Sequence, residues 1–316
     1  MIIKPGSEVK SEETVSDHPL NPNPDSEWCV YFKDNEKLLQ IDKDCRRLYP
    51  ELEFFQKATR FPCERLTNTE NGIGALRKRV ENCYLESHTV SRSRLGVTKM
   101  DTTRHKTGDS RPFHTLGESE EAHWEVVERM LFIYAKLNPG IQYVQGMNEL
   151  LGPLYFTMAS DPNLEWAQHA EADSFYCFTS LMAEVRDNFI KSLDDSICGI
   201  GGNMHILMSS LRDSDPAVHQ HLLSQHIKPE FFAFRWITLL LSQEFELPDV
   251  LRLWDSLFSD SQRFGFLVDV CCAMIRLVRR NVLKNDFASN MKLLQNYPPS
   301  TSIEEVIRAA IKSRKP

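Results

Sequence analysis

Apolar residues recur every three or four positions along most of this chain, the spacing that places side chains on one face of an α-helix. Residues 34–48 carry such a stripe, which predicts a helix with one face in the core: Leu38, Ile41, Cys45 and Leu48. Residues 118–137 carry a second stripe, formed by Trp124, Val127, Leu131 and Tyr134. No segment shows the sustained alternation of apolar and polar residues between hairpin turns that is typical of half-buried strands. The pattern therefore predicts an all-α protein with no significant sheet.

Turn and capping residues divide the rest of the chain into further predicted helices. Residues typical of helix starts precede several apolar stripes: Asp173, Asp215–Pro216, Pro229, Pro248, and Ser302 with Glu305. The segment 199–202 contains three glycines and predicts a break. The further helices are expected at about 51–58, 74–86, 149–159, 173–189, from 216 onward, 231–236, 250–254, 264–282 and 303–311.

Two segments lack a core-forming pattern. Residues 1–27 carry four prolines, many acids and serines and few apolar residues, which predicts a disordered N-terminal tail. Residues 87–117 are rich in Ser, Thr, His and basic residues, and we expect a mobile insertion there. Between residues 77 and 112, nine Lys and Arg outweigh four Asp and Glu, a balance of 9 − 4 = +5. Such a basic segment could also meet anionic lipid or an acidic partner.

The composition is ordinary for a globular protein, with 41% hydrophobic and 26% charged residues among 316. A net charge of −7 argues against general nucleic-acid binding, which needs a basic surface. The eight cysteines include no Cys-x-x-Cys pair, and we expect them to be reduced. No signal peptide is recognisable, and the longest apolar runs are short and interrupted by charges. We therefore expect a cytoplasmic protein, with any membrane contact limited to peripheral recruitment to endomembranes.

Several clusters do not form a convincing independent active site. His219, His221 and His226 are close in sequence, but no Cys or carboxylate completes a zinc set, so we interpret them as surface residues. The glycines of segment 199–202 are not followed by Gly-Lys-Ser/Thr, so they do not form a phosphate-binding loop. The adjacent pair Cys271–Cys272 falls in an apolar helical pattern and is typical of a core. No metal site is predicted.

Two polar features remain. Asp44 and Arg47 lie three residues apart near the end of a predicted helix, and on their own they are best interpreted as a solvated ion pair. Further along, residues 138–140 read Asn-Pro-Gly and break a helix before Gln145 and Gly146. A neutral amide on such a turn could orient a water molecule, or it could simply cap backbone groups between two helices.

Two segments, taken together, resemble the catalytic signatures of the TBC-domain family of Rab GTPase-activating proteins: Ile41-x-x-Asp44-x-x-Arg47 and Tyr143-x-Gln145-Gly146-Met147-Asn148. Their order, spacing and residue types match. Residues 234–237 (Phe-Arg-Trp-Ile) and 251–255 (Leu-Arg-Leu-Trp-Asp) are similar to two later blocks of that family. The resemblance covers residues 28–285 and implies a two-lobed helical TBC domain, followed by a C-terminal helical extension at 286–316.

The resemblance implies an activator of Rab-family small GTPases in their GTP state, and hence a regulator of vesicle trafficking. Arg47 would be an arginine finger oriented by Asp44, and Gln145 would be a glutamine finger that positions the attacking water. The residues that support the glutamine turn would be Tyr143, Gly146 and Asn148. No cofactor of its own is implied, because the partner would carry GTP and Mg²⁺.

The sequence departs from the family near its start. The Arg-x-x-x-Trp signature of the family has no counterpart, since Pro24 stands four residues before Trp28. The chain therefore resembles a shortened form, or one that starts inside the domain, and the lack of this helix would weaken the catalytic lobe. The alternative function is accordingly a non-catalytic TBC module that binds a Rab GTPase or a scaffold without accelerating hydrolysis.

Overall fold

We describe a computed structural model of the protein, which defines residue 23 and residues 26–67, 77, 79–80, 116–117, 120–190, 199–261 and 264–314. Helices make up the regular structure of these residues, and their one β-type contact is an isolated bridge between Ala58 and Ala122. The predicted all-α class is therefore confirmed. The predicted tail, the helix at 74–86 and the insertion at 87–117 lie almost entirely outside the described residues.

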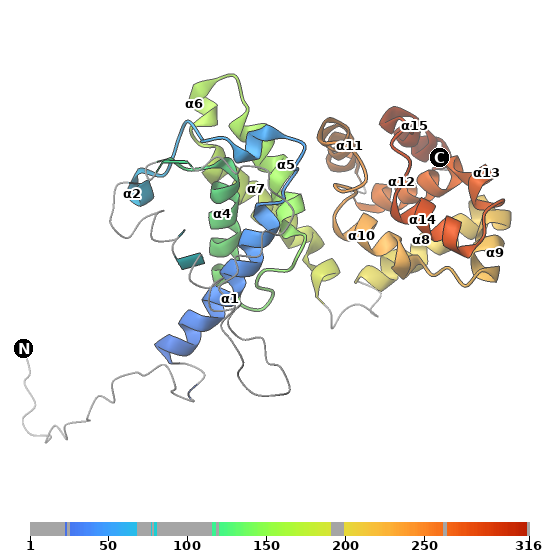
Figure 1. Ribbon diagram of the computed structural model, residues 1–316. Coiled ribbons are helices and arrows are strands. Elements are labelled where there is room, and N and C mark those ends of the chain that lie inside the picture. The colour runs from blue at the N-terminus through green and yellow to red at the C-terminus, as the bar shows by residue number, and fades with distance from the viewer. Residues whose placement is uncertain are drawn as a thin grey trace, which may run out of the picture.

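The helices form two lobes (Figure 1). The N-terminal lobe contains α1 (Glu27–Cys45), η1 (Glu53–Gln56), α2 (Glu64–Thr67), α4 (His123–Leu137), α5 (Met147–Ala159), α6 (Leu164–Ala167), α7 (Ala170–Val185) and η2 (Arg186–Phe189). The C-terminal lobe contains α8 (Ile200–Ser214), α9 (Pro216–Ser224), η4 (Pro229–Phe231), α10 (Ala233–Thr238), α11 (Leu247–Ser259), α12 (Phe264–Leu277), α13 (Arg279–Val282), α14 (Phe287–Gln295) and α15 (Ile303–Ser313).

Each lobe packs around a central helix, and the two lobes share one core. In the N-terminal lobe α4 contacts both α1 and α5, while in the C-terminal lobe α12 contacts α8 and α15. The lobes meet where α11 contacts α5 and where α10 contacts η2. Buried side chains from both lobes form one continuous hydrophobic cluster. Both predicted stripes are buried, Leu38 included, and seven of their residues belong to this cluster: Ile41, Cys45, Leu48, Trp124, Val127, Leu131 and Tyr134.

Helix α1 starts earlier and ends earlier than the predicted range of 34–48. It begins at Glu27 because the Ser26 hydroxyl accepts a backbone hydrogen bond at 3.0 Å and caps the helix. It ends at Cys45, after which the amide of Arg47 bonds to the carbonyl three residues back at 3.2 Å. This tighter bonding turns the chain away from the helix axis. Arg47 therefore lies two residues beyond the helix.

Two predicted helix starts and one predicted break are corrected by the structure. Asp173 does not cap α7 but lies in its first turn. Acidic residues are favoured at both places, so the sequence pattern alone does not distinguish them. Ser302 stands at the cap position of α15, but its side chain accepts no capping hydrogen bond, so the predicted capping box is absent. The expected break at 199–202 is confined to Gly199, since α8 begins at Ile200.

Other predicted helices exist with different bounds. The helix expected at 51–58 is only the 3₁₀ turn η1. The helix expected from residue 118 begins at His123, because the Glu125 carboxylate accepts the Ala122 amide at 2.7 Å and holds the first turn. The long helix expected at 264–282 is divided at Val278 into α12 and α13.

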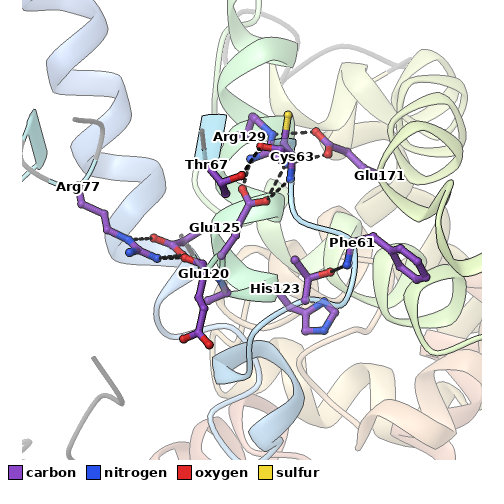
Figure 2. Close-up of polar contacts among 12 residues, drawn as sticks. Phe61, Cys63, Thr67, Arg77, Glu120, His123, Glu125, Arg129 and Glu171 are labelled. Carbon is purple, nitrogen blue, oxygen red and sulfur yellow. Dashed lines mark hydrogen bonds and ion pairs between the residues drawn. The ribbon is translucent and has the colours of Figure 1, made fainter. Parts of the chain in front are cut away.

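Ion pairs tie the first turns of α4 to their surroundings (Figure 2). Arg129 donates to Glu171 at 2.7 Å and also pairs with Glu121, whose side chain is fully buried. Arg77 forms two hydrogen bonds with Glu125, at 2.6 and 2.8 Å. Because Glu121 has lost its water shell, removing Arg129 would leave an uncompensated buried charge.

Asp215 is a predicted cap that the structure confirms. Its Oδ1 accepts the Val218 amide at 3.2 Å at the start of α9, and its Oδ2 accepts from Arg279 at 2.7 Å. We expect Asp215→Ala to lower the free energy of unfolding by about 2 kcal/mol, measured in urea, because a cap and a half-buried ion pair are both lost. Asp213→Ala, an exposed neighbour, should change it by less than about 0.5 kcal/mol. Equal losses in both variants would contradict this role.

Candidate functional site

The turn after α1 presents one exposed cation above a buried carboxylate. Asp44 is 7% exposed, whereas the Arg47 side chain is 71% exposed. Nη2 of Arg47 lies 3.2 Å from Oδ1 of Asp44, and its Nε donates to the Lys43 carbonyl at 3.0 Å. An ion pair this exposed contributes little stability. Its effect is to orient the guanidinium, which remains open to a molecule outside.

The turn before α5 needs a glycine. Gly146 has φ +102°, in the left-handed region that other residues rarely adopt, and it immediately precedes α5. A Cβ at this position would lie 2.7 Å from Cδ2 of Leu239 in the C-terminal lobe. The backbone of the turn and the C-terminal lobe are therefore in close contact. Gln145, next to this glycine, is exposed.

A buried hydrogen-bonded link joins the two turns. The Tyr143 hydroxyl donates to Oδ2 of Asp44 at 2.8 Å, although the two residues are 99 positions apart. Asn148 Oδ1 lies 3.3 Å from the same hydroxyl, and Asn148 Nδ2 lies 3.4 Å from the Asp44 carbonyl oxygen. Burial, and then the neighbouring charges, raise the pKa of Tyr143, so the hydroxyl keeps its proton and acts as a donor.

Both turns open onto one pocket of about 470 Å³ between the lobes. The structure brings five of the six predicted site residues into its lining: Asp44, Arg47, Gln145, Gly146 and Asn148. Tyr143 is 2% exposed and lies behind this lining. The pocket is completed by residues that our sequence-based assignment of the site left out: Glu149, Phe234, Arg235, Thr238, Leu239 and Gln243. Of these, Phe234 and Arg235 lie in the recognised 234–237 block, while the others carried no sequence signal.

Glu149 is the ionisable residue of the pocket whose properties are most altered. Burial raises its pKa from 4.5 to about 7, while hydrogen bonds from Gln243 and Asn148 act in the opposite direction. The nearby charge of Asp44 also raises it. Asn148 Nδ2 donates to Oε1 of Glu149 at 3.0 Å. The charge of this pocket therefore changes near neutral pH.

The pocket can interact with an anion and a water molecule but contains no recognisable nucleophile with its base. Arg47 offers a cation with several donors, and Gln145 offers an amide that both donates and accepts. Within the described ranges, no group of three or more His, Cys, Asp or Glu side chains could hold a metal ion. His219 and His221 are half-buried and His226 is exposed. The reacting groups would therefore come with a second molecule.

A second pocket, of about 480 Å³, lies within the N-terminal lobe. Its wall includes His123, whose Nδ1 lies 2.8 Å from the Tyr155 hydroxyl. Burial lowers the pKa of His123 to about 4, so the imidazole is neutral at physiological pH. Neither Arg47 nor Gln145 lines this pocket.

In the part of the chain that the structure describes, no helix is long and apolar enough to cross a membrane.

Comparisons with known proteins agree on one family. The model of the Rab-GTPase-TBC domain matches residues 80–283, which include Gln145 but begin after Arg47. TBC1 domain family member 13 from Mus musculus and from Homo sapiens are each 58% identical over 318 residues, covering 98% of this chain and 79% of each relative. The crystal structure of the Ypt/Rab-GAP domain of Gyp1p has a TM-score of 0.61 at 20% identity, covering 89% of this chain and 73% of that one. At this identity the structural likeness shows a shared fold.

The raised pKa of Glu149 predicts a pH-dependent loss of stability. The folded protein holds this proton more tightly than the unfolded chain, so the contribution is complete below pH 4.5 and is lost as pH rises through about 7. Glu149→Gln cannot ionise. We expect it to match wild type in urea unfolding at about pH 4 and to exceed it by about 1–3 kcal/mol at about pH 8. A difference that stays constant between these pH values would refute the assignment.

Proposed function

The chain belongs to the Rab-GTPase-TBC domain family, and on that basis we propose that it is a GTPase-activating protein for Rab-family small GTPases in their GTP state. The observation that carries the proposal is that Arg47 and Gln145, which are 98 positions apart, line one pocket. The partner brings GTP and Mg²⁺, and this chain brings the two side chains that complete the reaction site. Such an activator regulates vesicle trafficking by ending the GTP state of its Rab.

Arg47 acts on the charge that develops during hydrolysis. Negative charge accumulates on the β–γ bridging oxygen and on the γ-phosphoryl oxygens, and an inserted arginine raises the rate by about 10³- to 10⁵-fold. The Arg47 guanidinium is exposed, and it is oriented by Nε, which donates to the Lys43 carbonyl, and by Nη2, which donates to Asp44. It can reach a phosphate without first breaking a buried interaction. Its planar shape offers parallel donors to two phosphate oxygens.

Gln145 acts on the attacking water. Its amide can accept a hydrogen bond from the water and donate one to a phosphoryl oxygen, which orients the nucleophile in line with the bond that breaks. Gln145 takes this place from the glutamine of the GTPase itself. Gly146 permits the turn that presents it, while Tyr143 and Asn148 anchor that turn to Asp44. The two fingers are therefore supported by the same buried hydrogen bonds.

We further propose that the protein works in the cytoplasm and reaches endomembranes through peripheral contact, since its substrates would be membrane-associated. The alternative of a non-catalytic binding module makes a different experimental prediction. It requires binding that depends on GTP, with no change in the hydrolysis rate.

The test is single-turnover GTP hydrolysis by a panel of purified, GTP-loaded Rab proteins, with and without this protein. We expect strong acceleration of one or a few members, since inserted fingers stabilise only the transition state of a docked partner. Arg47→Ala should remove about 10³-fold or more of the acceleration, and Gln145→Ala should remove about 10²-fold or more. Because both residues are exposed, the free energy of unfolding of each variant should lie within about 0.5 kcal/mol of the wild-type value.

The matched controls are Arg212→Ala and Gln220→Ala, which remove an exposed arginine and an exposed glutamine from helices of the C-terminal lobe outside the pocket. Both should keep full activity. GTP-dependent binding without acceleration by the folded wild-type protein would favour the binding-module function. Acceleration that survives both finger substitutions would overturn the assigned roles.

A further inference from the structure

We propose that Gln243, in the turn that joins α10 to α11, is a positioning residue for Gln145, an inference that rests on the function proposed above. Gln243 belongs to the C-terminal lobe, whereas Gln145 belongs to the N-terminal lobe, and both line the same pocket. The C-terminal lobe would then help to set the position of the glutamine finger, in addition to providing the opposite wall of the pocket.

The Gln145 side chain is not held in place by its own contacts. It is exposed, and among the described residues it forms no hydrogen bond or ion pair. Its direction is therefore set by the backbone of the turn. That turn contains Gly146, whose missing side chain leaves the backbone more freedom than any other residue would. A turn of this kind needs neighbours that hold it.

The C-terminal lobe supplies two contacts to this turn. Leu239 packs so closely on Gly146 that an added Cβ would lie 2.7 Å from its Cδ2. Four residues further on, Gln243 lines the pocket together with Glu149, and its amide favours the charged form of the Glu149 carboxyl group. Glu149 lies in the first turn of α5, three residues after Gly146, and also accepts from Asn148 at 3.0 Å. Glu149 therefore connects Gln243 to the hydrogen bonds that support the finger.

The segment that carries Gln243 is itself firmly held. Leu240 and Leu241 both have left-handed backbones, with φ 50° and 62°, and both are fully buried. The Leu241 amide donates to the Trp236 carbonyl at 2.9 Å, and Trp254 Nε1 donates to the Leu240 carbonyl at 2.9 Å. Such backbones persist only where surrounding contacts impose them. The segment thus provides a fixed support against which the glutamine turn rests.

Gln243→Ala separates positioning from docking. If Gln243 acts through Gln145, the maximal single-turnover rate should fall by about three- to tenfold, because a displaced finger orients the water poorly. The protein concentration that gives half-maximal acceleration should change by less than about twofold, because the docking surface is intact. Gln220→Ala, at an exposed glutamine of α9, is the matched control and should change neither value. A change in the half-maximal concentration alone would overturn the proposal.

A second variant tests the pathway. In a Gln145→Ala background, Gln243→Ala should lower the maximal single-turnover rate by less than about 1.5-fold, because the finger that Gln243 positions is already absent. A full three- to tenfold loss in that background would show that Gln243 acts independently of Gln145. That result would also overturn the proposal.

Hydrogen–deuterium exchange decides the question without any GTPase. The backbone amides of residues 144–149 should exchange about two- to tenfold faster in Gln243→Ala than in Gln220→Ala or wild type, because the support of the turn is lost. Unchanged exchange would refute the role of Gln243 even if the wild-type protein is a strong activator. Conversely, if wild type accelerates no Rab, the proposed function fails while the exchange comparison still decides whether Gln243 holds the turn.

Discussion

The candidate site depends on one buried hydrogen bond, between the Tyr143 hydroxyl and the Asp44 carboxylate. Hydrogen bonds to a charged, water-excluded group are worth about 1.5–3 kcal/mol, and leaving the carboxylate unpaired would cost more. This hydrogen bond is buried and is not itself a contact with a ligand. What the bond does is fix the end of α1 against the turn before α5. Because Arg47 and Gln145 lie on these two turns, their separation follows from a contact made beneath them.

The pocket is therefore built with buried supports and exposed tips. Asp44, Tyr143 and Asn148 have almost no contact with water, whereas Arg47 and Gln145 are exposed. This arrangement suits a protein that contributes side chains to a partner's reaction, because the tips can enter another site while the supports stay in place. The C-terminal lobe adds a second support through Leu239, which packs on Gly146. Beside this contact lies Glu149 of α5, a half-buried acid whose charge changes near neutral pH. Stability and local charge are thus linked at the boundary between the lobes.

Much of the fold could be predicted because helical periodicity is a local property. The stripes of α1 and α4, and the cap at Asp215, could be identified from residue types and spacing alone. The errors occurred at helix ends, where several residues compete for the same backbone groups, as at Asp173 and Ser302. Within the site, the motif residues could be named from their pattern. Leu239, Gln243 and Glu149 could not, because their importance comes from contacts between lobes that no local spacing encodes.

If both fingers come from this chain, it should accelerate even a Rab GTPase that lacks its own water-positioning glutamine. The measurement is single-turnover hydrolysis by an accelerated Rab in which that glutamine is replaced by alanine. We expect this protein still to accelerate the altered Rab strongly, and Gln145→Ala to abolish that acceleration. Acceleration of the normal Rab together with none of the altered one would mean that the water is oriented by the GTPase. The pocket would then supply the arginine alone.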